Sequence, residues 1–383
     1  MSGHRAFVLP RDGLGKLVTI LREDGYRVVG PTVQGDAIIY DEITELDDLP
    51  KGKGDEQSGG HYRVRERGDA ALFGYTVGPQ SWKKFLYPSR VRLVRAVRDG
   101  NGFVVKNGEP EEPPRYAFLG VRSCELEAIA IHDRVFLGGE YADPTYQTRR
   151  ERALIIAVNC AEPGGTCFCA SMNTGPHAQR GYDLALTEML DGSRHEFFVD
   201  VATDRGRELL ARLAARPATD ADRTAADRVT DRAAERMGRH LDTRGLPDLL
   251  RTNGESPRWA EVASRCLACA NCTMVCPTCF CSTMDDTSDL AGNTAERWRK
   301  WDSCFTTEFS YLHGGSVRRS GRSRYRQWLT HKLSAWHDQF GMSGCVGCGR
   351  CITWCPVGID LTEEVEAIRA AERTQGQPQE VGR

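Results

Sequence analysis

The sequence predicts an α/β or α+β domain at the N-terminus and a cysteine-rich, mainly α-helical domain at the C-terminus. Two observations indicate this division. Short β-rich runs alternate with helical patterns up to residue 203. Of the 15 cysteines, none precedes Cys124 and eleven fall between Cys266 and Cys355. The length of 383 residues is sufficient for two or three domains.

The first domain is expected to span residues 1–203, with helices at Gly13–Glu23 and Glu125–Phe136. Its strands are predicted at Val28–Val33, Ala37–Tyr40, Tyr62–Val64, Ala71–Val77, Val91–Val97, Tyr116–Val121, Leu154–Val158, Asp183–Thr187 and Phe197–Val201. The strand at Tyr116–Val121, the helix after it and the strand at Leu154–Val158 predict a βαβ unit with parallel strands.

The rest of the chain divides by composition. Residues 204–257 are rich in Ala, Arg and Asp and begin with a predicted helix at Asp204–Ala215, so we expect a helical connector. The cysteine-rich domain is expected at 258–371, and the polar segment 372–383 is expected to be a disordered tail.

Charge and missing motifs exclude several function classes. Lys plus Arg number 51 against 53 Asp plus Glu, so no global basic field favours nucleic acid. The chain has no dinucleotide fingerprint and no P-loop, and we expect it to bind neither NAD nor flavin and to have no substrate-converting site. The longest apolar run, Ala153–Val158, is too short to cross a membrane. We expect a cytoplasmic chain, in which crowded cysteines favour metal ligation over disulfides.

Two four-cysteine runs carry the strongest chemical signal. Cys266-x2-Cys269-x2-Cys272-x3-Cys276-Pro is repeated as Cys345-x2-Cys348-x2-Cys351-x3-Cys355-Pro. This spacing is typical of [4Fe–4S] clusters, and in the bacterial ferredoxin pattern the last cysteine of each run binds the other cluster. One cluster would take Cys266, Cys269, Cys272 and Cys355, and the other Cys345, Cys348, Cys351 and Cys276. Zinc fits less well because its sites normally combine two separated cysteine pairs.

The segment between the runs indicates the kind of ferredoxin module. It is 68 residues long and contains helical patterns at Cys304–His313 and Tyr325–Phe340. We therefore expect an α-helical ferredoxin-like dicluster domain; the alternative is a βαβ ferredoxin with a long insertion.

Seven cysteines lie outside the two clusters. Cys124 and Cys160 each follow a predicted strand, and Cys167 and Cys169 lie one loop further on, so these four could hold a third cluster at the sheet edge. The alternative is that they are ordinary buried residues. The other three, Cys279, Cys281 and Cys304, could shield the clusters or group with Cys167 and Cys169. Five arginines within 318–326 favour either a solvated helix face or a charge that offsets the clusters.

Several segments resemble a known family. They are GVRSCELEAIAIHDRVF (120–136), NCAEPGGTCFCASMNTGP (159–176), CPTCFC (276–281), WDSC (301–304) and GCVGCGRCITWCPVGID (344–360). These segments resemble the β (iron–sulfur) subunit of cytoplasmic sulfhydrogenases, the NAD(P)-linked [NiFe] hydrogenases. The A subunit of anaerobic sulfite reductase is closely similar.

The resemblance implies an electron-transfer subunit of an oxidoreductase hetero-oligomer. It would relay electrons between an FAD/NAD(P)-binding subunit and a catalytic [NiFe] subunit, and only the cluster cysteines carry over residue by residue. The alternative role, that of the sulfite reductase subunit, would feed a sirohaem subunit. An iron–sulfur redox sensor or a structural metal module is a third reading, although no DNA-reading helix accompanies the cysteines.

Overall fold

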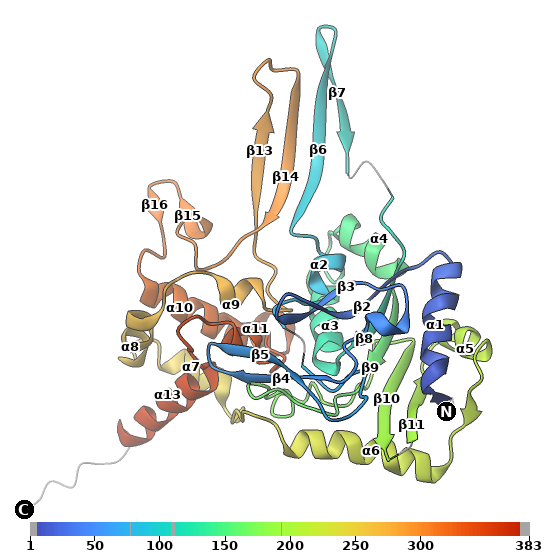
Figure 1. Cartoon of the computed structure of the whole chain (residues 1–383). Helices are drawn as coiled ribbons and strands as arrows, with labels where there is room; N and C mark the ends of the chain where they lie inside the picture. The colour runs from blue at the N-terminus through green and yellow to red at the C-terminus, as the bar shows by residue number, and fades with distance from the viewer. Residues whose placement is uncertain (1–5, 77, 109–111, 193, 376–383) are drawn as a thin grey trace, which may run out of the picture.

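The computed structural model describes residues 6–76, 78–108, 112–192 and 194–375. An eight-stranded mixed sheet forms the centre of the N-terminal part (Figure 1). In spatial order its strands are β12 (Arg216–Pro217), β1 (Ala6–Pro10), β11 (Arg194–Val201), β10 (Leu184–Asp191), β9 (Leu154–Val158), β8 (Tyr116–Val121), β2 (Arg27–Gln34) and β3 (Ala37–Glu42).

The parallel centre of this sheet confirms the predicted βαβ unit. β8 and β9 pair in parallel, and α3 (Ser123–Leu137) and α4 (Pro144–Arg152) connect them. β2 and β10 extend the parallel region on either side. Every residue of β9 is buried, as expected for a strand covered on both faces. The carboxyl ends of β8 and β9 therefore deliver the residues after them to one edge of the sheet.

Helices cover both faces of the sheet. α1 (Arg11–Glu23) buries Leu14, Leu17 and Leu21 at helical spacing in the cluster that contains Leu9 of β1. The neighbouring residue Val8 packs instead with Ala226 of α6 (Asp220–Glu235). Successive strand residues point to opposite faces, so α1 and α6 lie on opposite sides of the sheet. α5 (Asp204–Ala211) precedes β12.

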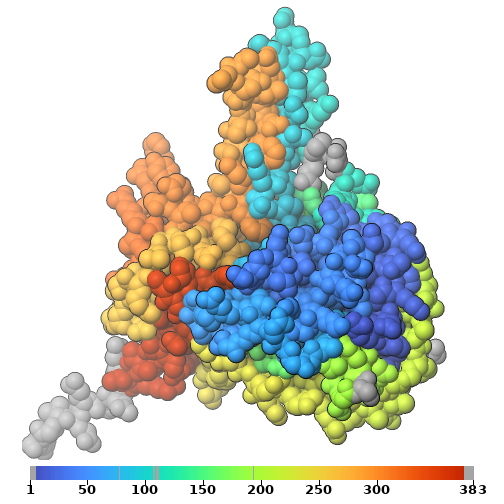
Figure 2. Space-filling view, in the orientation of Figure 1, coloured from blue at the N-terminus to red at the C-terminus, as the bar shows by residue number. Residues whose placement is uncertain are grey.

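Two hairpins from distant parts of the chain form an arm that projects from the body (Figures 1 and 2). The arm is a four-stranded antiparallel sheet in the order β13 (Ser282–Ser288), β14 (Thr294–Trp301), β6 (Arg90–Asp99) and β7 (Gly102–Asn107). The predicted strand Val91–Val97 thus belongs to β6, outside the central sheet. A further hairpin, β4 (Lys53–Ser58) and β5 (His61–Glu66), lies against the C-terminal part, where Gly60 N donates to Ile352 O at 3.1 Å.

The cysteine-rich part is built from short helices. They are α7 (Leu246–Thr252), α8 (Arg258–Arg265), α9 (Asn271–Met274), α10 (Gly321–Thr330), the π-helical turn η3 (His331–Ala335), α11 (Trp336–Phe340), α12 (Arg350–Thr353) and α13 (Leu361–Gln375). Trp259, Tyr325, Trp328 and Leu333 form their shared core. The helices predicted within Tyr325–Phe340 are confirmed. None of the described helices is both long and apolar enough to span a bilayer.

One predicted strand is wrong. Residues 71–76 form no strand in the structure, and residue 77 lies outside the described residues. The run is buried as an irregular segment whose backbone bonds to side chains: Leu72 N and Phe73 N donate to the carboxylate of Glu188 at 2.7 and 2.9 Å. Arg122 donates to Phe73 O and Tyr75 O. These partners satisfy the backbone groups that a neighbouring strand would otherwise bond.

Three other boundaries differ from expectation. The segment predicted as helical at Cys304–His313 contains a 3-10 turn at Glu308–Ser310 and the first strand of a small hairpin, β15 (Tyr311–Leu312) with β16 (Gly315–Ser316). Gly314 and Gly315 turn this hairpin at φ +102° and +133°, which a helix cannot accommodate. The helix after residue 203 ends at Ala211 and not at Ala215. α13 continues through residues 372–375, where the tail was predicted, and residues 376–383 lie outside the described part.

Candidate metal centre

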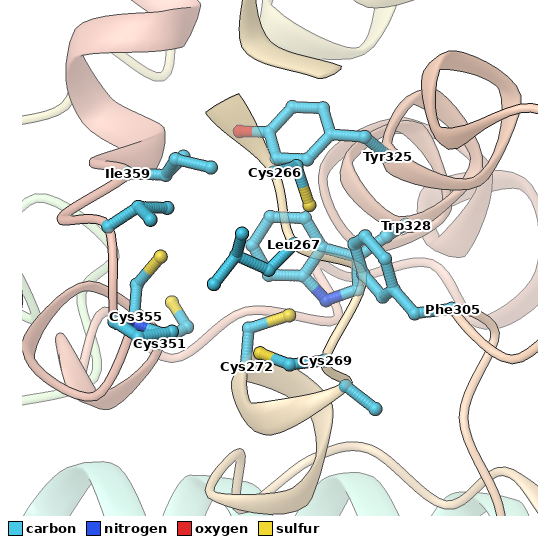
Figure 3. Close-up of a pocket in the computed structure, with 13 residues that line it drawn as sticks. Cys266, Leu267, Cys269, Cys272, Phe305, Tyr325, Trp328, Cys351, Cys355 and Ile359 are labelled. Atoms are coloured by element: carbon cyan, nitrogen blue, oxygen red, sulfur yellow. The ribbon is translucent and has the colours of Figure 1, made fainter. Parts of the chain in front are cut away.

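The first predicted ligand set surrounds one cavity. Cys266, Cys269, Cys272 and Cys355 line it, together with Cys351. Figure 3 shows the sulfur atoms gathered around this space, from a loop after α8 on one side and the end of the second run on the other. Cys355 lies far along the chain from the other three, so the structure brings together the residues that the crossed pattern predicts.

The second predicted set also gathers. The thiols of Cys345, Cys348 and Cys351 lie close enough to that of Cys276 to influence one another electrostatically. The pKa of Cys345 is raised to about 12, mainly by burial, and the ammonium of Lys332 opposes this rise. Thiols held neutral in this way bind metal only by losing their protons, so metal loading releases protons here.

The two runs follow the same backbone path. In each run the N–H two residues after the first cysteine approaches that cysteine's sulfur: Ala268 N lies 3.4 Å from Cys266 Sγ and Gly347 N lies 3.5 Å from Cys345 Sγ. Both of these residues have positive φ, and so do the residues two positions later, Ala270 and Gly349. The repeated turn places an N–H donor on a thiolate in each set, which is an interaction that tunes iron–sulfur clusters.

The chemistry of the donor set fits a multi-iron cluster. Within the described ranges, no three His, Cys, Asp or Glu side chains surround a point closely enough to bind a single ion. The first set instead encloses a cavity lined by Phe305, Tyr325 and Trp328. A [4Fe–4S] cubane takes one thiolate on each of its four irons, and the first set places four thiols around one space.

Two comparisons with known proteins bear on this arrangement. Residues 265–359 match the 4Fe-4S dicluster domain family. The chain is also 29% identical over 356 residues to sulfhydrogenase 2 subunit beta of Pyrococcus furiosus. The aligned region covers 91% of this chain and 94% of that protein. The chain is therefore similar to a sulfhydrogenase β subunit along most of its length, and it contains a 4Fe-4S dicluster domain. No solved structure matches it.

This iron–sulfur protein contains a second cysteine-lined cavity. It is lined by the candidate third set, Cys124, Cys160, Cys167 and Cys169, and Cys348 lies on its wall. Cys124 lies in the first turn of α3 after β8, and Cys160 follows β9, so the parallel strands deliver them to the same edge. Burial raises the pKa of Cys167 to about 12, with further contributions from the neighbouring thiols.

The three surplus cysteines lie beside both sets of the dicluster domain, with Cys279 next to Cys276 of the second set and Cys304 near Cys272 of the first. The Cys279 thiol contacts that of Cys276, and the Cys281 thiol contacts that of Cys304. The expected alternative grouping of these residues with Cys167 and Cys169 is therefore not formed.

Sequence reasoning missed the buried charged residues of the dicluster domain. Arg350 forms a buried ion pair with Glu125 of α3, at the junction of the two domains. Lys332 Nζ lies 3.1 Å from Cys276 Sγ and 2.9 Å from Thr278 Oγ1. The position of Arg350 between two cysteines of the second run could have indicated a charge near the clusters. Lys332 lies outside both runs, and nothing in the sequence pointed to its role.

The arginine-rich segment 318–326 is partly neutralised. Arg322 and Arg326 each pair with Glu255 at 2.8 Å, and Arg324 donates to Thr307 Oγ1 at 3.0 Å. The charge of Arg324 also lowers the pKa of Cys266, although burial is the larger influence and raises it. The segment thus combines surface ion pairs with a weak positive field at the first set.

Proposed function

We propose that this chain relays electrons between an FAD/NAD(P)-binding subunit and a catalytic [NiFe] subunit within a hetero-oligomer. The observation that carries the proposal is the similarity to a sulfhydrogenase β subunit along nearly the whole chain, combined with the gathering of both predicted thiol sets. Bound iron–sulfur clusters supply one-electron transfer, and the protein provides the thiolates, the spacing and the surrounding charge.

We assign Cys266, Cys269, Cys272 and Cys355 to one [4Fe–4S] cluster and Cys345, Cys348, Cys351 and Cys276 to the other. Cys351 supports adjacent clusters, because it belongs to the second set and also lines the cavity of the first. Each cluster then depends on both runs. The helices within the runs, α9 and α12, are only four residues long and would not be stable by themselves.

We assign a third cluster to Cys124, Cys160, Cys167 and Cys169. Arg122, on the wall of their cavity, donates to the backbone carbonyls of Phe73, Tyr75 and Asn159, so its charge favours an anionic occupant. Cys348 lies on the same wall and belongs to the second set, so the second cluster would lie between the other two. The three sites then form a row from the surface near α8 to the edge of the central sheet.

We place the complex in the cytoplasm. All 15 cysteines are free thiols in the structure. Free thiols in such number persist in a reducing compartment.

Anaerobic purification of the tagged full chain from its native host tests the partners. Flavin and nickel should elute with the chain in constant ratio to its iron. Sirohaem in place of nickel would support the sulfite reductase role instead. A chain that elutes alone and binds DNA would contradict the electron-relay proposal and favour a redox sensor.

A further inference from the structure

A buried lysine contacts the second thiol set from an unusual helical turn. Lys332 is 6% exposed and lies on the π-helical turn η3, where the extra residue per turn interrupts the regular helix between α10 and α11. Such turns occur frequently at functional sites. The Lys332 carbonyl accepts from Gly344 N at 2.8 Å, immediately before Cys345. Its backbone therefore contacts the start of the second run while its side chain reaches the end of the first.

The three partners of the Lys332 ammonium are a thiol, a hydroxyl and a backbone carbonyl. They are Cys276 Sγ at 3.1 Å, Thr278 Oγ1 at 2.9 Å and Gly344 O at 3.4 Å. None of these partners is a carboxylate. A buried ammonium is stable only beside a compensating negative charge. Of these three partners only the Cys276 thiol can readily lose a proton and supply that negative charge. The site is therefore built for an anion at Cys276.

A second lysine approaches the same thiols from the N-terminal domain. Lys83 of α2 (Lys83–Leu86) is 5% exposed, donates to Cys279 O at 3.1 Å and lies 3.9 Å from the centre of the Trp301 ring. Lys83 thus donates to the backbone beside the set, whereas Lys332 donates to a thiol of the set itself.

The two sets of the dicluster domain differ in their surroundings. Cys269 of the first set is exposed and its neighbour Leu267 is 63% exposed, so water reaches that site. Cys276 of the second set is buried between the domains. An added electron makes a thiolate-bound cluster more negative, so burial opposes its reduction and nearby positive charge favours it.

We propose that Lys332 is a positioning residue that raises the reduction potential of the cluster bound through Cys276 and so offsets the effect of its burial. This inference rests on the proposed cluster assignment. Because the cluster of Cys345, Cys348, Cys351 and Cys276 lies in the middle of the row, a potential far below that of its neighbours would block electron passage. Lys332 keeps the middle site reducible.

Redox titration of the anaerobic, cluster-loaded full chain tests the inference, with each cluster followed by electron paramagnetic resonance. Lys332→Met should shift one cluster to more negative potential and leave the others unchanged, at wild-type iron and sulfide content. Lys332→Arg should restore the wild-type value because it keeps the charge. Lys84→Met is the matched control: Lys84 Nζ bonds to Tyr40 O and Gln80 Oε1, both at 2.7 Å.

Unshifted potentials in fully loaded Lys332→Met would overturn the inference, as would an equal shift in Lys84→Met. If the Met variant loads poorly, Lys332→Gln replaces it, since it keeps an N–H donor without the charge. A Gln variant with the wild-type potential would also overturn the inference. Wild-type chain without iron–sulfur signals would instead refute the proposed function, so the two failures are distinguishable.

Discussion

At the scale of single residues, the two cysteine runs form the same turn with positive φ but use different residue types in it. Ala268 and Ala270 adopt positive φ in the first run, where Gly347 and Gly349 do so in the second. An alanine in this region costs roughly 1–2 kcal/mol. The second run uses glycine because the N-terminal domain packs directly on it. A Cβ on Gly347 would lie 2.7 Å from Cys169 N, and one on Gly349 would lie 2.3 Å from Thr166 O.

Gly347→Ala should therefore destabilise the protein by more than about 1 kcal/mol, because left-handed strain and a backbone clash act together. Ala268→Gly, at the equivalent turn, should cost nothing or stabilise. Thermal unfolding of the anaerobic proteins measures both. Equal stability of Gly347→Ala and wild type would show that the loop of Cys169 does not pack on the second run.

The crossed ligand assignment makes a second residue-scale prediction. Cys355→Ser should give the same spectroscopic loss as Cys269→Ser, because both belong to the first set, and should differ from Cys348→Ser. Cys304→Ser is the control, since this thiol contacts Cys281 and belongs to neither set. If Cys355→Ser instead matches Cys348→Ser, each run binds its own cluster and the crossed assignment is wrong.

At the scale of elements, the pattern of a segment correctly predicted those helices and strands whose structure depends mainly on that segment. β8, α3 and β9 were expected because their apolar runs and helical spacing agree with their final environment. The run at 71–76 has the same composition as a strand, but its backbone bonds to Glu188, a residue more than a hundred positions away. The pairing of β6 with β14 is equally non-local, so the arm could not be derived from the separate hairpins.

Contacts between elements also differ in strength according to burial. The ion pair of Glu125 and Arg350 joins α3 to α12 and is fully buried. Glu125→Ala should destabilise the loaded protein by about 3–5 kcal/mol, because it leaves a buried guanidinium unpaired. Asp286→Ala, which removes the exposed pair with Arg297 on the arm, should have little effect. Denaturant unfolding compares the two, and similar losses would contradict this account of the junction.

At the scale of the whole molecule, the N-terminal domain and the dicluster domain form one continuous body. Thr353 Oγ1 donates to Gln57 Oε1 at 2.9 Å, and Thr174 Oγ1 donates to Val346 O at 2.6 Å. Cysteine spacing alone predicted both dicluster sets, because sequence separation within a run fixes the geometry of its loop. The convergence of the candidate third set followed from the parallel order of β8 and β9. The charges at the junction depend on packing between domains, which the sequence does not encode locally.

Removal of iron should destabilise the cysteine loops more than the central sheet. The cysteine loops contain only the short helices α9 and α12, whereas the central sheet has a large apolar core of its own. We expect faster amide hydrogen exchange in 266–276 and 345–355 after chelation, with β8 and β9 still protected. Unchanged exchange in both cysteine runs would mean that the clusters do not hold them together.

The most direct test of the central claim is the content of iron and acid-labile sulfide per anaerobically purified chain. Three cubane clusters predict roughly twelve of each, falling to roughly eight when Cys167 and Cys169 are both replaced by serine. If the wild-type chain contains about eight of each and the double substitution does not change this content, only the assignment of the third cluster is wrong. Folded chain that contains zinc or no metal would contradict the whole account.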